Sequence, residues 1–232
     1  MRLNDPEVVR AEYAEESRLE ERIAAWQGLT GPNPRELALE AVAESRPRRV
    51  LEAGCGQGWA AEWIKGELGA EVVAIDQSER MVELTRRRGV DARVGDVQDL
   101  PFDDGSFDAA LAAWMLYHVP DLDRTLAELR RVLRQGGRLF VATNGREHLA
   151  DLLRAAGGEP LVTQFSSENA AEVLGRHFEH VVQRDIETRA TFPDHAAARA
   201  YLATFAPALA DTLPHFDGPR TYAGRTAVLS AH

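Results

Sequence analysis

A chain of 232 residues, 44% hydrophobic and 28% charged, is long enough to bury one substantial core, so we expect one domain over 1–232. Its formal net charge of −10 disfavours a nucleic-acid partner, because binding to phosphate backbones depends on clustered cations. The sequence has one cysteine, Cys55, which excludes an internal disulfide and a multi-cysteine metal site.

The first 46 residues are predicted to form a helical cap. Residues 1–10 mix charges of both signs without an apolar signal core, and no window approaches the roughly 18 consecutive apolar residues of a membrane span. We therefore expect a cytoplasmic protein with no membrane partner. One helix is predicted over 6–28, and a second begins at Pro34, with Asn33 as its N-cap, and runs to about Ser45.

Residues 47–145 alternate short apolar runs with amphipathic segments, which is the pattern of βαβ units around a parallel sheet. Strands are predicted at 49–53, 71–75, 91–94, 107–112 and 137–143. The clearest helix is 122–134, in which leucines recur at spacings of four, three and four, and Gly136 is expected to form its left-handed C-cap.

Residues 146–232 are predicted to complete the sheet. The pattern indicates helices at 146–156, 167–175 and 194–205 and strands at 178–186 and 226–230. The segment 207–220 holds three prolines and a glycine, so a loop is predicted there. Together the seven strands predict an α/β fold with a doubly wound, mostly parallel sheet.

Three glycines at alternate positions follow the first predicted strand of this sheet. Gly54, Gly56 and Gly58 stand between that strand and a helix. A glycine has no Cβ, so the chain can turn sharply and a ligand can lie against the backbone, beside the free amides of the helix start. Dinucleotide enzymes usually space these glycines as Gly-x-Gly-x-x-Gly. A purely structural tight turn stays open as the alternative.

Two acids end the next two strands. Asp76 closes the apolar run Val72–Ile75, where a carboxylate can accept hydrogen bonds from both hydroxyls of a ribose or can cap the following helix. Asp96 is followed by Val97, so the acid could accept from an adenine amino group while the valine packs against the ring. The alternative is that Asp96 simply ends a strand.

These motifs resemble the class I S-adenosylmethionine-dependent methyltransferases, in particular the group similar to quinone-biosynthesis methyltransferases. The segments that carry the resemblance are Leu51–Gly58, Asp76 with Met81, Gly95–Val97 with Leu100–Phe102, Ser106–Ala109, Leu116–Asp121 and Leu133–Leu139. The resemblance implies a Rossmann-like fold with S-adenosylmethionine as cofactor and S-adenosylhomocysteine as product.

The resemblance also implies roles for individual residues. The glycines would line the methionine part of the cofactor, Asp76 would bind its ribose, and Trp114 would meet its amino-acid end through the backbone. The full set of cofactor-binding residues implied in this way is Tyr13, Glu52, Ala53, Gly54, Gly56, Gly58, Asp76, Gln77, Met81, Asp96, Val97, Ala113 and Trp114. Many relatives carry a small polar residue where this chain has Ala112 and Ala113, so only backbone groups can serve there.

The predicted function is methyl transfer to a small-molecule acceptor by in-line displacement. The candidate general base is His118, just past the fourth strand, although a histidine there can equally hydrogen-bond the backbone and orient the loop. Residues 146–232 are expected to complete the acceptor site. They match no motif that names the acceptor, and the sequence does not distinguish O-, N- or C-methylation or the oligomeric state.

Two other functions stay open. A nicotinamide-dependent oxidoreductase shares the glycine turn and the ribose acid, but the glycine spacing and the pair Asp96-Val97 argue against it. A non-catalytic S-adenosylmethionine-binding regulator is the second alternative. No metal site is expected, because His177 and His180 lack nearby cysteine or acidic ligands at metal-site spacing.

Overall fold

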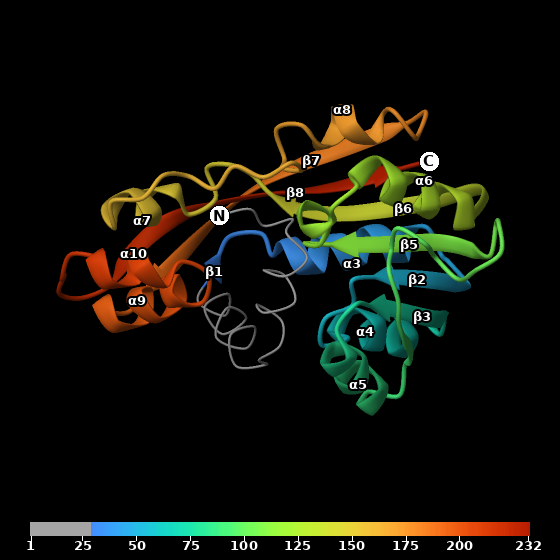
Figure 1. Ribbon diagram of the computed structural model, residues 1–232, viewed down its shortest axis with the longest axis horizontal. Coiled ribbons are helices and arrows are strands. Elements are labelled where there is room, and N and C mark those ends of the chain that lie inside the picture. The colour runs from blue at the N-terminus through green and yellow to red at the C-terminus, as the bar shows by residue number, and fades with distance from the viewer. Residues whose placement is uncertain (1–28) are drawn as a thin grey trace.

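The computed structural model describes residues 29–232 (Figure 1). The helix predicted over 6–28 and the implied cofactor-binding residue Tyr13 lie outside this range. Within it, eight strands form one sheet in the order β1-β7-β8-β6-β5-β2-β3-β4. No helix in this part of the chain combines the length and the apolarity that crossing a membrane requires.

Seven of these strands form the predicted mostly parallel sheet. The strands β2 to β6 pair in parallel, and β8 runs antiparallel between β6 and β7. Their bounds are β2 Arg49–Ala53, β3 Glu71–Asp76, β4 Asp91–Val94, β5 Phe107–Ala113, β6 Leu133–Asn144, β7 Val181–Phe192 and β8 Arg220–Ala231. The eighth, β1 (Leu29–Thr30), adds two residues to the edge beside β7.

Helices cover both faces of the sheet, as a doubly wound fold requires. Along β2, Val50 packs in the cluster that contains Leu39 and Ile64, whereas its neighbour Leu51 packs on the opposite face with Leu126. The helices are α3 Pro34–Glu44, α4 Trp59–Leu68, α5 Glu79–Arg87, the 3-10 turn η1 Leu116–His118, α6 Leu122–Val132, α7 Ala150–Ala155, α8 Ala170–Leu174, α9 His195–Ala203 and α10 Pro207–Thr212.

Local signals placed most helix starts correctly. The Asn33 side chain accepts from the Arg35 amide at 3.0 Å, and Pro34 opens α3, as predicted. The predicted end of α6 is wrong, because the helix stops at Val132 and Gly136, with φ +74°, lies inside β6. Leu133 is extended and pairs with Phe107, so sheet pairing overrides the helical leucine pattern there.

The C-terminal part departs most from the prediction. The strands β7 and β8 are longer than predicted because they pair along their full length, from Val181 with Ala231 to Phe192 with Arg220. Residues 207–212 form the helix α10 instead of a loop, since a proline in the first helical turn loses no amide hydrogen bond. Figure 1 shows α7, α9 and α10 gathered at one end of these long strands, away from β2 and β3.

Candidate functional site

A cavity of about 440 Å³ opens at the carboxyl ends of β2, β3, β5 and β6. The order of the sheet reverses between β2 and β5, and such a reversal is where ligands bind in open α/β sheets. We call the side lined by Glu52, Gly54–Gln57, Asp76, Gln77 and Asp96–Gln98 the glycine half. We call the side lined by Asn144, Gly145, His148, Leu149, Leu152, Leu153, Leu161, Thr163, Tyr201, Leu202 and Phe205 the C-terminal half.

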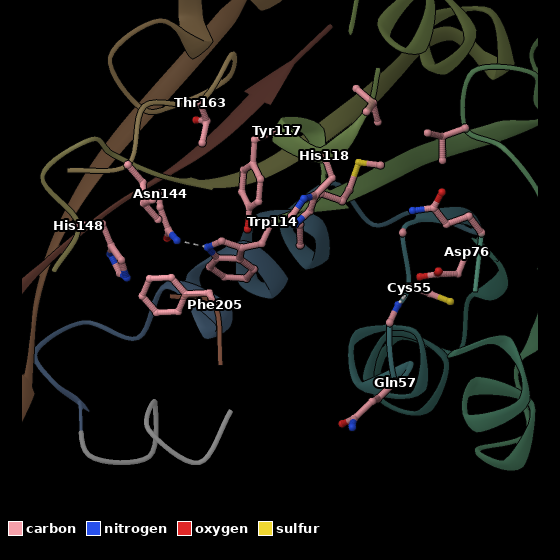
Figure 2. A pocket seen from close by; sticks show the side chains of 18 of the residues that line it. Cys55, Gln57, Asp76, Trp114, Tyr117, His118, Asn144, His148, Thr163 and Phe205 are labelled. Atoms are coloured by element: carbon pink, nitrogen blue, oxygen red, sulfur yellow. Dashed lines mark hydrogen bonds between the residues drawn. The ribbon is translucent and has the colours of Figure 1, made fainter. Parts of the chain in front are cut away.

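Residues from the end of β5 separate the two halves. Figure 2 shows Cys55, Gln57 and Asp76 on one side and Asn144, His148 and Phe205 on the other, with Trp114, Tyr117 and His118 between them. The site therefore joins the glycine turn and the C-terminal helices in one continuous cavity.

The glycine turn after β2 needs glycine at two positions for different reasons. Gly54 has φ +70°, and a Cβ there would lie 2.9 Å from the Met115 side chain, which lines the cavity. Gly58 has φ +75° and is the N-cap residue of α4, but a Cβ there would lie within 2.8 Å of three side-chain atoms of the buried Thr85. Gly54 shapes the cavity wall, whereas Gly58 packs behind it.

Asp76 ties the glycine turn to the end of β3. Its Oδ2 accepts from the Gly56 amide at 2.9 Å and its Oδ1 accepts from the Ser78 amide at 2.9 Å. Burial raises the pKa of this carboxyl, against the lowering effect of these two hydrogen bonds. The N-cap of α5 is Ser78, whose hydroxyl accepts from the Met81 amide, so the helix-cap alternative for Asp76 is wrong.

Glu52 is a buried carboxyl that lines the cavity with an unused oxygen. The residue is 4% exposed, and this burial raises its pKa to about 8. A hydrogen bond from the Ala61 backbone lowers the pKa, and the negative charge of Asp76 raises it further. Its Oε2 has no hydrogen-bond partner among residues 29–232. A buried acceptor without a donor is costly, so this oxygen is suited to a donor or a cation carried by a ligand.

Asp96 and Val97 also line the glycine half. Asp96 accepts from the Gln98 amide at 2.8 Å, while Val97 is buried. This acid and this valine thus form a polar edge beside an apolar surface.

The predicted cofactor residues divide into those that line the cavity and those that lie behind it. The ones that line it are Glu52, Gly54, Gly56, Asp76, Gln77, Asp96, Val97, Ala113 and Trp114, together with the candidate base His118. Ala53, Gly58 and Met81 are not among the lining residues, and Ala53 and Met81 are buried.

Trp114 occupies the junction between the two halves with an unusual backbone. Its φ is +54°, which is a rare conformation for a bulky residue and one that clusters at functional sites. Its amide donates to the Ala142 carbonyl at 2.7 Å, and its indole Nε1 donates to Asn144 Oδ1 at 3.0 Å. The adjacent rings of Tyr117 and His118 stand 4.4 Å apart, tilted by 60°.

The glycine turn and the strands around it match a known protein family. Residues 51–141, from within β2 to within β6, match the model of the family described as "Methyltransferase domain". Residues 51–141 are thus similar to a methyltransferase domain. The match confirms the resemblance to S-adenosylmethionine-dependent methyltransferases that the sequence motifs indicated.

Curated relatives match the same domain. The chain is 41% identical over 118 residues to a ubiquinone biosynthesis O-methyltransferase of Xanthomonas oryzae pv. oryzae, which covers 48% of this chain and 49% of that protein. It is 37% identical over 120 residues to the methyltransferase GfsG of Streptomyces halstedii, covering 48% of this chain and 43% of that protein. The chain thus spans about half the length of these relatives.

Solved structures share the fold beyond the methyltransferase domain. One is an S-adenosylmethionine-dependent methyltransferase of Thermotoga maritima, with a TM-score of 0.60, 23% identity, and coverage of 93% of this chain and 94% of that one. Another, from Mesorhizobium loti, has a TM-score of 0.55, 22% identity, and coverage of 86% and 98%. At these identities the likeness establishes the fold.

Several lining residues were missed by sequence reasoning. Arg35 of α3 places its guanidinium 4.9 Å from the centre of the Trp59 ring, and burial lowers its pKa. His148 places Nδ1 against the Arg225 backbone, and burial lowers its pKa to about 4, so it is neutral at pH 7. Asn144 ends β6 beside the methyltransferase domain, and the rule that drew attention to the end of β5 could have found it.

Two histidines outside the cavity contact other side chains. His177 Nε2 lies 3.1 Å from Asp123 Oδ1, and the ring centroids of His180 and His232 lie 5.0 Å apart with the rings tilted by 44°. Among residues 29–232 no group of three or more His, Cys, Asp or Glu side chains is arranged to hold a metal ion.

Proposed function

We propose that this protein binds S-adenosylmethionine in the glycine half and transfers its methyl group to a small molecule in the C-terminal half. The observation that carries the proposal is the buried, unused Oε2 of Glu52 beside the glycine turn. An ammonium group is the ligand chemistry that would relieve such an oxygen. The methyltransferase domain over 51–141 supports the same cofactor.

The residues present fit the parts of this cofactor. Glu52 would receive its ammonium group, and Arg35, which lines the same cavity beside Trp59, would face its carboxylate. Asp76 would accept from the ribose hydroxyls, and Asp96 with Val97 would hold the adenine edge. Gly54 allows the ligand to approach the backbone, because its missing Cβ keeps the space beside Met115 open.

The bound cofactor would supply an electrophilic methyl group on a sulfonium. Loss of that group would leave a neutral thioether, so no residue of this chain would have to protonate the leaving group. Trp114 and Tyr117 at the junction would hold the acceptor in line and exclude water. Such positioning contributes roughly 7–11 kcal/mol in ideal intramolecular cases.

We propose that His118 is the general base that accepts the proton of an acidic methyl acceptor. It lines the cavity at the junction, next to Tyr117, where a hydroxyl or an acidic carbon would meet the methyl group. Acceptors that attack without losing a proton would not need it. A cytoplasmic location and the absence of a nucleic-acid partner stay predictions.

Calorimetric titration with S-adenosylhomocysteine tests the cofactor, with NADH as the matched control ligand. We expect saturable binding of the first and none of the second. Binding of NADH in its place would support an oxidoreductase. Transfer of labelled methyl groups from S-adenosylmethionine into an organic extract would then separate an enzyme from a non-catalytic binding protein.

A further inference from the structure

We propose that Asn144 is a specificity residue that selects an uncharged, largely apolar methyl acceptor carrying an oxygen that accepts a hydrogen bond. That the occupant is a methyl acceptor rests on the proposed function. The chemistry of the occupant is inferred from the residues that line the C-terminal half of the cavity.

The C-terminal half is walled mainly by aliphatic and aromatic side chains. Helix α7 supplies Leu152 and Leu153, and helix α9 and the residues after it supply Tyr201, Leu202 and Phe205. These helices share a hydrophobic cluster of their own, separate from the clusters on the two faces of the parallel sheet. The wall therefore favours an occupant that is mostly apolar.

Among residues 29–232, no charged side chain belongs to this half, and the cation of the cavity lining, Arg35, lies against the Trp59 ring of α4. The titratable groups that line it are His148 and Tyr201, and burial keeps the histidine neutral at pH 7 by lowering its pKa to about 4. The acids Glu52, Asp76 and Asp96 all belong to the glycine half. A charged acceptor would lose its hydration here without gaining a counter-charge, so the wall selects against it.

Asn144 is the polar group whose orientation the structure fixes. An indole nitrogen can only donate, so the atom that faces Trp114 Nε1 at 3.0 Å must be the amide oxygen. The Thr226 hydroxyl lies 3.3 Å from the same oxygen. The amide nitrogen must then take the other direction.

That amide nitrogen is the donor offered to the occupant. Asn144 lines the cavity, and within residues 29–232 no hydrogen bond engages its Nδ2. Trp114 is held in turn by its left-handed backbone and by its bond to Ala142. A rigid donor in an apolar wall discriminates for an oxygen on the ligand, because a ligand without one leaves the amide unpaired.

Equilibrium dialysis with two probes of matched shape tests this inference. The probes are 2-acetylnaphthalene, which has a carbonyl oxygen, and 2-ethylnaphthalene, which has none. The measured quantity is the dissociation constant of the ketone divided by that of 2-ethylnaphthalene. We expect this ratio to be about tenfold higher in Asn144→Leu than in the unmodified protein, because the ketone loses its hydrogen-bond donor. In Asn144→Asp at pH 8 the oxygen that serves Trp114 is kept and the donor is lost, so the same shift is expected.

Thr163→Val is the matched control. Thr163 also lines the C-terminal half, but its hydroxyl already donates to the Phe165 carbonyl at 2.7 Å, so the ratio should stay unchanged. An unchanged ratio in both Asn144 variants, an equal shift in the control, or no binding of either probe would overturn the inference. Charged 2-naphthoate should bind at least tenfold more weakly than the ketone, and equal binding would refute the uncharged class.

The same titrations are run with and without saturating S-adenosylhomocysteine. Failure of that compound to bind would remove the proposed function. A ratio of dissociation constants that depends on Asn144 without this compound would still establish an apolar site that recognises an oxygen on its ligand. Failure of the proposed function and failure of this inference are therefore distinguishable.

Discussion

Asp76 Oδ2 accepts a hydrogen bond from the Gly56 amide at 2.9 Å, although 20 residues separate them in the sequence. One carboxylate therefore both holds the glycine turn in place and faces the cavity where a ribose would lie. Asp76→Ala should weaken S-adenosylhomocysteine binding by at least about tenfold, because it removes the proposed ribose acceptor and releases the turn. Calorimetry measures this, with Asp91→Ala at the exposed start of β4 as control. Equal affinity in Asp76→Ala and the unmodified protein would remove the ribose assignment.

The raised pKa of Glu52 has a consequence for stability. Its folded-state pKa of about 8 exceeds the ordinary value of 4.5, so the folded protein binds more protons and loses stability as pH rises between these values. Glu52→Gln removes that loss and should be the more stable protein at pH 9, by up to roughly 5 kcal/mol. Urea unfolding at pH 9 and pH 5 tests this, and the advantage should shrink greatly at pH 5.

The same substitution should impair binding. In the proposed complex, a cofactor ammonium would select the ionised form of Glu52, so affinity for S-adenosylhomocysteine should rise as pH increases from 6 to 8. Glu52→Gln should bind more weakly at pH 8 and lose this pH dependence. A variant that is stabilised and yet binds normally would show that the buried carboxyl faces something other than the cofactor.

The role of His118 can be separated from cofactor binding. His118→Ala should lower the rate of methyl transfer into an acidic acceptor at least about a hundredfold, with little change in S-adenosylhomocysteine affinity. The pH–rate profile of the unmodified protein should also show a limb that this variant lacks. Equal losses in rate and affinity would instead indicate that the ring only orients the loop after β5.

Much of the fold could be predicted because its signals are local. Short apolar runs located the strands β2 to β5, and the spacing of Gly54 and Gly58 located the turn that the cavity uses. The C-terminal half could not be predicted in this way. Asn144 and Trp114 are 30 residues apart and meet only through the pairing of β5 with β6. Long-range pairing also made Gly136 part of a strand when its local pattern favoured a helix end.

Gly58 offers a test of packing behind the turn. Gly58→Ala should destabilise the protein by roughly 2–4 kcal/mol, because alanine would have to adopt a left-handed backbone and its Cβ would displace Thr85. The Thr85 hydroxyl donates to the Gly56 carbonyl at 3.0 Å. Gly69→Ala is the control, since its φ is +62° but no atom lies within 4 Å of the added carbon. It should cost only about 1 kcal/mol. Equal destabilisation of the two variants in thermal unfolding would show that Thr85 can move away from the new Cβ without loss of stability.

Asp108 joins segments of the sheet at the end opposite the cavity. Its Oδ2 accepts from the Arg48 amide at 2.7 Å and the Arg49 amide at 2.8 Å, and its Oδ1 accepts from the Arg134 guanidinium. Burial raises the pKa of Asp108, but these hydrogen bonds outweigh it and lower the pKa overall. Asp108→Ala should therefore cost about 1–3 kcal/mol at pH 7 by leaving two backbone amides without acceptors.

The pH dependence of that cost identifies its cause. A lowered folded-state pKa means that the stabilisation is complete above the ordinary pKa of 3.8 and is lost as pH falls below it. Urea unfolding should thus show the gap between Asp108→Ala and the unmodified protein narrowing from pH 7 to pH 3. Asp104→Ala, which removes an exposed partner of Arg131, should change stability little at either pH. A gap that stays constant with pH would mean that lost packing, and not the ionised carboxylate, accounts for the destabilisation.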